Sequence, residues 1–154
     1  MTGSIEARLR ELNIELPEGS APVAAYVPVT RSGNTLYISG QLPMWKGELR
    51  CKGLLGRDVK LEDAQAAARL CGLNILAHIR NACGNLDSVR RVLKLGGFVA
   101  CTADFTDHPK VVNGASELMI EVFGDIGRHA RFAVGAPSLP LGAAVEVDAI
   151  IEVG

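Results

Sequence analysis

The sequence predicts one α+β domain over residues 1–154, in which helices cover one face of a mixed β-sheet. The chain length of 154 residues fits one domain, and 48% hydrophobic with 21% charged residues is typical of a globular protein with a core. Segments of period-two hydrophobicity alternate with segments of helical period in the order β-β-α-β-α-β-β. Because two α-β units follow a hairpin, we expect both helices on the same side of the sheet.

Residues 1–20 are expected to form an N-terminal extension to this domain. Within them, a short amphipathic helix over 4–13 would place Ile5, Leu9 and Leu12 on one side.

The first two strands are expected to form a hairpin. Strands over Val23–Val29 and Thr35–Ser39 would be joined by Arg31-Ser32-Gly33-Asn34, which has the Gly and Asn that suit the positive φ of a tight turn. Residues 43–58 are expected to be a long loop with one short strand around Leu49–Leu54.

The remaining elements follow from periodicity and from helix-end signals. They are a helix over 61–83, a strand over 89–102, a helix from 108 to 123, and two strands over about 130–136 and 143–153. Gly84 suits the end of the first helix, and Pro109 is tolerated in the first turn of the second. Gly96-Gly97 suggests a β-bulge within the third strand.

The charge balance argues against nucleic-acid and membrane partners. The net charge is −1, and no Lys/Arg stripe is visible. No apolar run could span a bilayer, and the polar N-terminus is unlike a signal peptide.

The four cysteines (Cys51, Cys71, Cys83 and Cys101) lack C-x-x-C pairs and zinc spacing. We therefore expect free thiols in a reducing cytoplasm, no metal site and no cofactor.

Two opposite charges flank the last connection of the chain. Taken alone, Arg131 is a solvated residue at a strand start, and Glu146 is the outward-facing neighbour of Val145 and Val147. Antiparallel pairing of two strands joined by residues 137–142 would bring both charges to the same end and face. From the residues alone, two separate surface charges and one shared site that contains Arg131 and Glu146 both stay open.

Four motifs in the same order resemble the RidA/YjgF family of reactive-intermediate deaminases, formerly called L-PSP endoribonucleases. They are YISGQLP (37–43), QAAARLCGLNILAHI (65–79), VVNGASELMIEVFG (111–124) and ARFAV…LPLGAAVEV (130–147). The resemblance implies a chorismate-mutase-like α+β fold and a homotrimer with ligand clefts between subunits. It also implies hydrolysis of 2-imino acids to 2-keto acids and ammonia.

By motif position, the resemblance assigns Arg131 to the substrate carboxylate and Glu146 to a water molecule. The lining positions it implies are Tyr26, Ser39, Gly40 and Asn113, and backbone N–H groups around Gly40 and Ala133 could hold the substrate. Ala133 stands where the family often has Cys, and His129 where it often has Pro. These departures bear on substrate preference more than on the fold.

Other readings of the same residues stay open. A non-catalytic trimer could bind small carboxylates or a protein partner through Arg131, and an endoribonuclease would need a basic track that the sequence lacks. Tyr26 could be only a strand aromatic, Ser39 could only shape a turn, and Asn113 could only contact its own helix. The roles of Trp45 and His129 are open.

Overall fold

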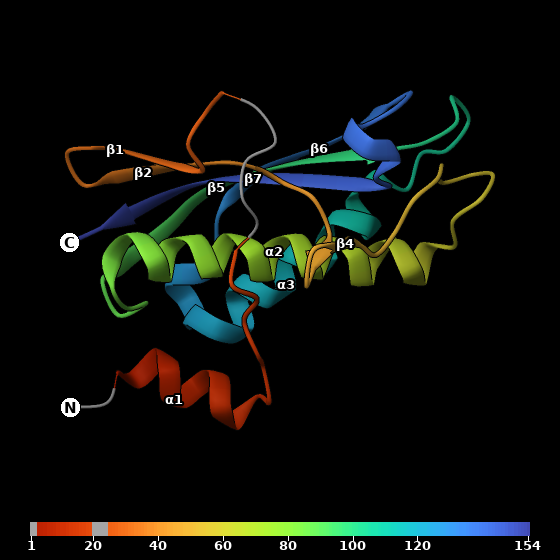
Figure 1. Ribbon diagram of the computed structural model, residues 1–154. Helices are drawn as coiled ribbons and strands as arrows, with labels where there is room; N and C mark the ends of the chain where they lie inside the picture. The colour runs from red at the N-terminus through yellow and green to blue at the C-terminus, as the bar shows by residue number, and fades with distance from the viewer. Residues whose placement is uncertain (1–2, 20–24) are drawn as a thin grey trace.

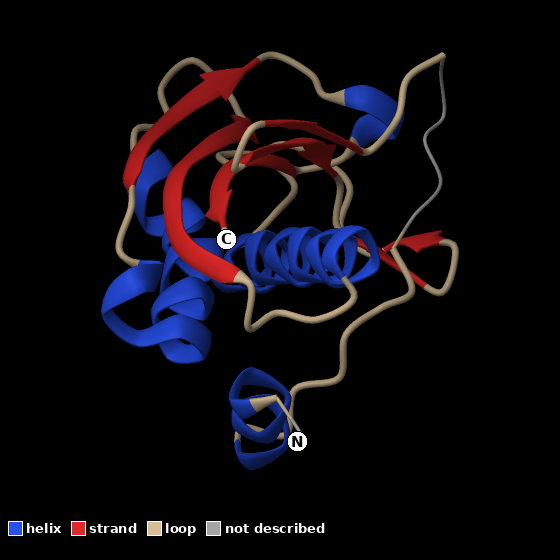
Figure 2. Ribbon diagram, turned by 90° about the vertical axis from the view of Figure 1, so that its left-hand side faces the viewer, coloured by secondary structure: helices blue, strands red, loops and turns tan. Residues whose placement is uncertain are grey.

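A computed structural model describes residues 3–19 and 25–154 and confirms the predicted α+β architecture. Five strands form one sheet in the order β1-β2-β7-β5-β6. The strands are β1 (Val29–Ser32), β2 (Thr35–Gln41), β5 (Val89–Ala100), β6 (Ala130–Ala136) and β7 (Val145–Val153), and the two long helices are α2 (Leu61–Cys83) and α3 (His108–Phe123). Both helices lie on the same side of the sheet (Figures 1 and 2). We call that side the helix face and the opposite side the open face.

Strand β5 lies between β7 and β6 in the sheet. It pairs antiparallel with β7 and parallel with β6, so β6 and β7 are not neighbours. The expectation that the last two strands pair directly is therefore wrong. Because a parallel pair needs a crossover connection, α3 carries the chain from the end of β5 back to the start of β6. The connection after β6 then returns the chain past β5 to β7.

The two long helices begin and end where the sequence predicts. Helix α2 ends at Gly84, which has a left-handed φ of 81°, and α3 carries Pro109 in its first turn. The apolar stripe of α2 is buried in the core, with Ile75, Leu76 and Ile79 at 0% exposure. Periodicity located both helices because each buries one long apolar stripe against the sheet.

The first hairpin is shifted along the chain relative to its prediction. Strand β1 covers Val29–Ser32, residues 25–28 are not strand, and the rest of the expected strand over Val23–Val29 falls partly outside the described residues. The turn needs only two residues, with Gly33 at a φ of 58°. Arg31 and Ser32, which the composition assigned to the turn, are therefore paired strand residues.

Residues 43–58 contain a small hairpin rather than the expected strand at 49–54. It is formed by β3 (Met44–Trp45) and β4 (Glu48–Leu49), with positive φ at Lys46 and Gly47 in the two-residue turn. Asn74 of α2 fixes this hairpin, because its side-chain Nδ2 donates to the Met44 carbonyl oxygen at 2.9 Å.

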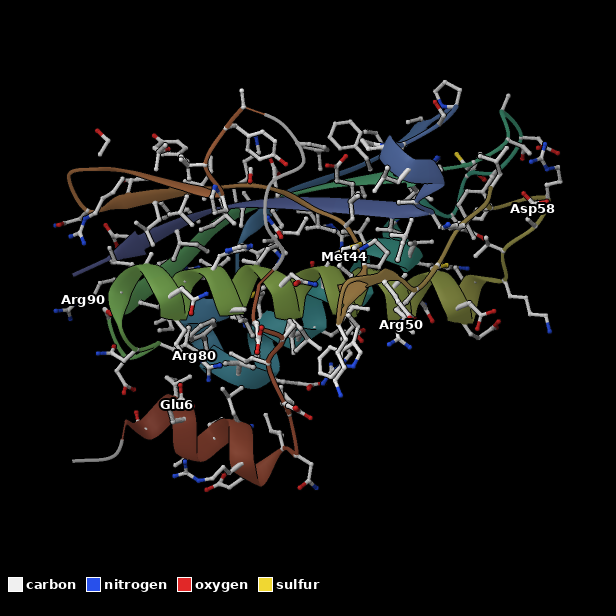
Figure 3. The ribbon with its side chains drawn as sticks, in the orientation of Figure 1. Glu6, Met44, Arg50, Asp58, Arg80 and Arg90 are labelled. Atoms are coloured by element: carbon white, nitrogen blue, oxygen red, sulfur yellow. The ribbon has the colours of Figure 1, made fainter. Side chains whose placement is uncertain are left out.

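The N-terminal helix α1 (Ser4–Glu11) lies on the far side of the helical layer from the sheet (Figures 1 and 2). It ends two residues earlier than the predicted 4–13 segment. Leu9 is buried, and Glu6 points toward Arg80 of α2 (Figure 3), with an O···N distance of 3.4 Å. The extension is thus attached to α2 and α3 by both apolar and charged contacts.

The predicted bulge at Gly96-Gly97 is wrong. Both glycines pair regularly with β6 and β7, and the irregularities lie nearer the start of β5 and at residues 38–41 of β2. A Cβ atom at Gly97 would lie 2.5 Å from Val112 of α3. This glycine therefore allows close approach of the helix to the sheet.

Two helix glycines allow α2 and α3 to pack closely, and they give a matched test of that contact. A Cβ at Gly114 would overlap the Gln65 backbone carbonyl of α2, whereas a Cβ at Gly72 would meet the movable Leu118 side chain at 2.9 Å. We predict that Gly114→Ala destabilises the protein by roughly 1–3 kcal/mol, because backbone cannot yield. Gly72→Ala should cost less, because the Leu118 side chain can move aside, while the gain of about 0.5–1 kcal/mol in helix propensity is the same at both positions. Urea unfolding of both variants measures the difference, and equal losses would contradict the assignment.

Candidate functional site

The Arg131 side chain is fixed on the helix face at the sheet edge. Its Nη1 donates to Asn113 Oδ1 at 2.8 Å and to Ser116 Oγ at 3.2 Å, and its Nη2 donates to the Pro109 carbonyl oxygen at 3.4 Å. Partial burial lowers the pKa of Arg131 from its usual value. Within residues 3–19 and 25–154, no carboxylate lies within ion-pair distance of this guanidinium. Neutral acceptors thus orient a cation whose charge is free to bind an anion.

A second layer of hydrogen bonds holds Ser116, which the sequence analysis did not identify. Ser116 Oγ lies 2.8 Å from His129 Nε2, and His129 Nδ1 lies 2.6 Å from the Gly127 carbonyl oxygen. Because a carbonyl only accepts, Nδ1 must carry the imidazole proton, and Nε2 then accepts the Ser116 hydroxyl proton. The Ser116 oxygen remains oriented as an acceptor for Arg131.

His129, whose role the sequence left open, is therefore the base of this chain of hydrogen bonds. Burial is the main cause that lowers its pKa, and the positive charges of Arg131 and Arg91 lower it further, so the ring is neutral near pH 7. A signal was present in the sequence: Asn113 and Ser116 are three apart on a helix, and His129 and Arg131 are two apart on a strand. Each pair shares one face of its element.

Glu146 lies on the open face of the sheet. It alternates with Val145 and Val147, which are fully buried on the helix face. It pairs with Phe98 of β5, which is exposed. Burial raises the pKa of the Glu146 carboxyl, and the nearby Asp148 carboxylate raises it further. This carboxylate is therefore a stronger base than an ordinary glutamate.

The structure does not bring Arg131 and Glu146 together within one chain. Arg131 of β6 pairs with the buried Leu95 of β5. Glu146 of β7 pairs with Phe98 of β5, which in turn pairs with Val134, three residues beyond Arg131 on β6. The two positions are roughly 10 Å apart across the sheet and roughly 10 Å along it, on opposite faces. The expectation of a shared face is wrong. Strand β5 separates the two strands, and the register aligns Arg131 and Glu146 with β5 residues that point to opposite faces of the sheet.

Strand β2 carries two of the predicted residues, Ser39 and Gly40, and Gly40 lies close to Glu146. Gly40 lies in the irregular part of β2, and a Cβ there would lie 2.5 Å from Glu146 Oε2. Ser39 donates from both its backbone nitrogen, at 2.9 Å, and its Oγ, at 3.2 Å, to the Pro28 carbonyl oxygen. Ser39 therefore shapes the segment that precedes β1, which also carries the exposed Tyr26.

Ala133 and Asn113 belong with Arg131. Ala133 lies two residues after Arg131 on β6, pairs with Gly97 and packs against the core. Asn113 contacts Arg131 directly, so the reading of Asn113 as a local helix contact is wrong. Of the predicted residues, Asn113 and Ala133 thus accompany Arg131, and Gly40 accompanies Glu146 on the other side of the sheet.

The described chain offers no cluster of three or more His, Cys, Asp or Glu side chains placed to hold a metal ion. The same residues contain no helix with the length and apolar character needed to cross a bilayer. All four cysteine thiols are free.

A mixed sheet with two helices on one face and an oriented arginine at its edge defines a class of small YjgF/chorismate-mutase-like proteins. The family described as "YjgF/chorismate mutase-like, putative endoribonuclease" matches residues 6–153, and the chain belongs to this RidA/YjgF family. Family membership and the chorismate-mutase-like fold are both confirmed.

Individual relatives are similar along nearly the whole chain. Protein TCP17 of Trypanosoma cruzi is 46% identical over 152 residues, 98% of this chain and 95% of the relative. The crystal structure of Atu1372, a protein of unknown function from Agrobacterium tumefaciens, is 53% identical with a TM-score of 0.91, covering 97% of this chain and 92% of that one. A "putative endoribonuclease" from Shewanella oneidensis is 36% identical with a TM-score of 0.94, covering 98% and 100%.

The hydrogen-bond chain behind Arg131 predicts how His129 titrates. By NMR, the pKa of His129 should lie below the usual histidine value, and long-range ¹H–¹⁵N spectra should show the proton on Nδ1. Arg131→Gln should raise this pKa, because one positive charge beside the ring is removed, but not to its usual value, because burial remains. His78 is the internal control: burial alone lowers its pKa, so the variant should leave it unchanged. An unchanged His129 would contradict the coupling.

Proposed function

We propose that the chain hydrolyses 2-imino acids to 2-keto acids and ammonia, and that its active site is completed between two copies in a homotrimer. The observation that carries the proposal is the pair of unlike groups described above. An oriented guanidinium without a carboxylate partner suits a small carboxylate ligand. A half-buried carboxylate of raised pKa suits a general base.

Arg131 supplies the carboxylate anchor in this proposal. A guanidinium offers two parallel N–H groups to the two oxygens of a 2-imino acid, and such a charge-assisted contact contributes about 1.5–3 kcal/mol. Asn113 and Ser116 hold the guanidinium in position before the ligand arrives. Binding therefore does not have to order the Arg131 side chain.

Glu146 supplies the base. A protonated imine carbon is already electrophilic, so the protein needs to hold a water molecule against it and accept one proton from that water. Attack of the water forms a tetrahedral carbinolamine, and transfer of the proton to the nitrogen lets ammonia leave and the keto group form. The raised pKa of Glu146 strengthens it as a proton acceptor.

The placement of the two groups supports an inter-subunit site. Arg131 and Glu146 face opposite sides of the same sheet, so a small imino acid held by Arg131 can meet only the Glu146 of another copy. The open face also carries exposed apolar side chains: Phe98 and Val134 are aligned with Glu146, and Tyr37 lies four residues farther along, opposite Ile150. A second sheet packed there would cover them.

Two alternatives are weaker on the described residues. Ribonuclease activity, which the family description names, needs phosphate-binding cations, but Glu146 and Asp148 place negative charge on the open face. A non-catalytic binder would use Arg131 alone and would leave Glu146 without a role. Turnover separates that binder from the enzyme.

Single substitutions should separate binding from turnover. Arg131→Ala should weaken pyruvate binding by about 10- to 100-fold, and Arg131→Lys should also bind poorly because an ammonium lacks the two-pronged contact. Glu146→Gln should keep pyruvate affinity and lower keto-acid release from an imine generated in situ by about 100-fold or more. Full turnover in Glu146→Gln would remove its assigned role.

Complementation tests whether two copies share one site. Arg131→Ala and Glu146→Gln chains, carrying different tags and co-expressed, should form mixed trimers that recover about a third of wild-type turnover, since one of the three sites in each mixed trimer has an intact Arg131 beside an intact Glu146. Each variant alone should remain inactive. No recovery in mixed trimers would place both groups in one subunit and contradict the proposal.

The acid side of the pH–rate profile should depend on Asp148. As pH falls, protonation of Glu146 removes the base, and its raised pKa makes turnover fall at a higher pH than an ordinary glutamate would allow. Asp148→Asn removes a charge that raises this pKa, so the fall should move to lower pH. Glu152→Gln, on the same face of β7 but farther along the strand, is the control and should not move it. A pH–rate profile that does not move in the Asp148→Asn variant would contradict the coupling between Asp148 and Glu146.

A further inference from the structure

A thiol and an imidazole meet beside β6 at the start of α3. Cys101, just after β5, has its Sγ 3.4 Å from Nε2 of His108, the first residue of α3. The Phe105 ring packs edge-on against the His108 ring, with 5.4 Å between centroids, and restricts its orientation. A nucleophile and a base within hydrogen-bond reach are the two groups that nucleophilic catalysis requires.

The pair lines a cavity of about 390 Å³. Thr102, Phe105, Ala136 and Pro137 form much of its remaining wall, and none of these side chains is charged. Of the nearest carboxylates, Asp104 accepts a hydrogen bond from Thr102 Oγ1 at 2.6 Å, and Asp107 pairs with Lys110 at 3.7 Å. The cavity is therefore suited to an uncharged ligand.

Gly135 makes room for both reactive atoms beside β6, and it lines the same cavity. A Cβ at this position of β6 would lie 2.7 Å from Cys101 Sγ and 2.7 Å from His108 Nε2. Any other residue would collide with the thiol and the imidazole together. The missing side chain lets both atoms pack close to β6 at the edge of the cavity.

The other three thiols have different surroundings. Cys71 is fully buried, and burial raises the pKa of Cys51, with the Asp63 charge raising it further. Among the described residues, Cys101 is the one cysteine whose sulfur contacts an imidazole. The molecule thus carries its own comparison set for thiol reactivity.

We propose that Cys101 and His108 form a nucleophilic thiol site that adds small, uncharged α,β-unsaturated carbonyl compounds. His108 Nε2 accepts the thiol proton. A bond then forms between Cys101 Sγ and the β carbon of the ligand as the ligand's C=C π bond breaks. The electron pair moves to the carbonyl-conjugated α carbon, which then takes the proton back from His108. The product is a thioether, and no oxidant or other reactant is needed. The positive end of α3 favours the negative charge on sulfur during the step.

This site is separate from the one proposed for imino acids. Gly135 lies four residues beyond Arg131 on the same face of β6, roughly 13 Å along the strand. The thiol proposal therefore does not rest on imine turnover. Its test uses only alkylation, so failure of either proposal leaves the other standing.

Acrylamide is the probe, and the full chain is its own control. After timed reaction at pH 7, peptide mass spectrometry measures the adduct at each cysteine. We expect Cys101 to react at least about tenfold faster than Cys51 and Cys83 in the same molecule. Iodoacetamide should alkylate Cys101 faster than the charged iodoacetate does. The ratio of the two rates should be larger at Cys101 than at a cysteine in a short peptide. Equal ratios would overturn the preference for uncharged ligands.

Two variants separate proton transfer from access. His108→Gln should slow Cys101 by about tenfold at pH 7 but have little effect near pH 10, where hydroxide removes the thiol proton. Gly135→Ala should slow Cys101 at both pH values, because it blocks the cavity. Unchanged rates at Cys51 and Cys83 show that each variant is folded. A Cys101 that reacts no faster than Cys51 and Cys83, or that is indifferent to His108→Gln, would overturn the proposal.

Discussion

The position of β5 between β6 and β7 determines which side chains one chain can bring together. The β5–α3–β6 crossover makes β6 an edge strand, and the register across β5 fixes which face each residue of β6 and β7 occupies. Arg131 consequently faces α3, and Glu146 faces the open side of the sheet. A one-residue change of register would reverse one of these assignments and expose core valines at the same time. The packing of the core therefore also fixes the separation of the two charged groups.

Both charged groups are partly buried, and each is supported differently. Neutral oxygens from α3 orient Arg131, with His129 and Gly127 behind them, so the cation keeps its charge available. Glu146 has Asp148 as its charged neighbour, so burial and repulsion act in the same direction. Within one chain, Arg131 does not oppose that shift, because it lies on the other face of the sheet. One group is thus prepared to bind an anion, and the other to accept a proton.

Periodicity and end signals were sufficient for the long elements, because each buries a regular apolar stripe. They failed where pairing decides the structure. The shift of β1, the β3–β4 hairpin and the separation of β6 from β7 depend on partners that no local pattern reveals. The motifs located Arg131, Asn113, Gly40 and Glu146 in the chain, but their division between two faces required the register. Ser116 was missed because a serine in a helix has no distinctive signal until its neighbours in space are known.

Missing side chains matter as much as present ones on this sheet. Gly40 leaves room for the Glu146 carboxylate, Gly97 lets α3 approach β5, and Gly135 leaves room for Cys101 and His108. At each of these positions a methyl group would occupy the space used by a functional group or by a core side chain. A tightly paired sheet offers few other routes to such space, because its strands are held about 4.8 Å apart. Glycine positions within the strands therefore decide where this fold can expose chemically active atoms without loosening its core.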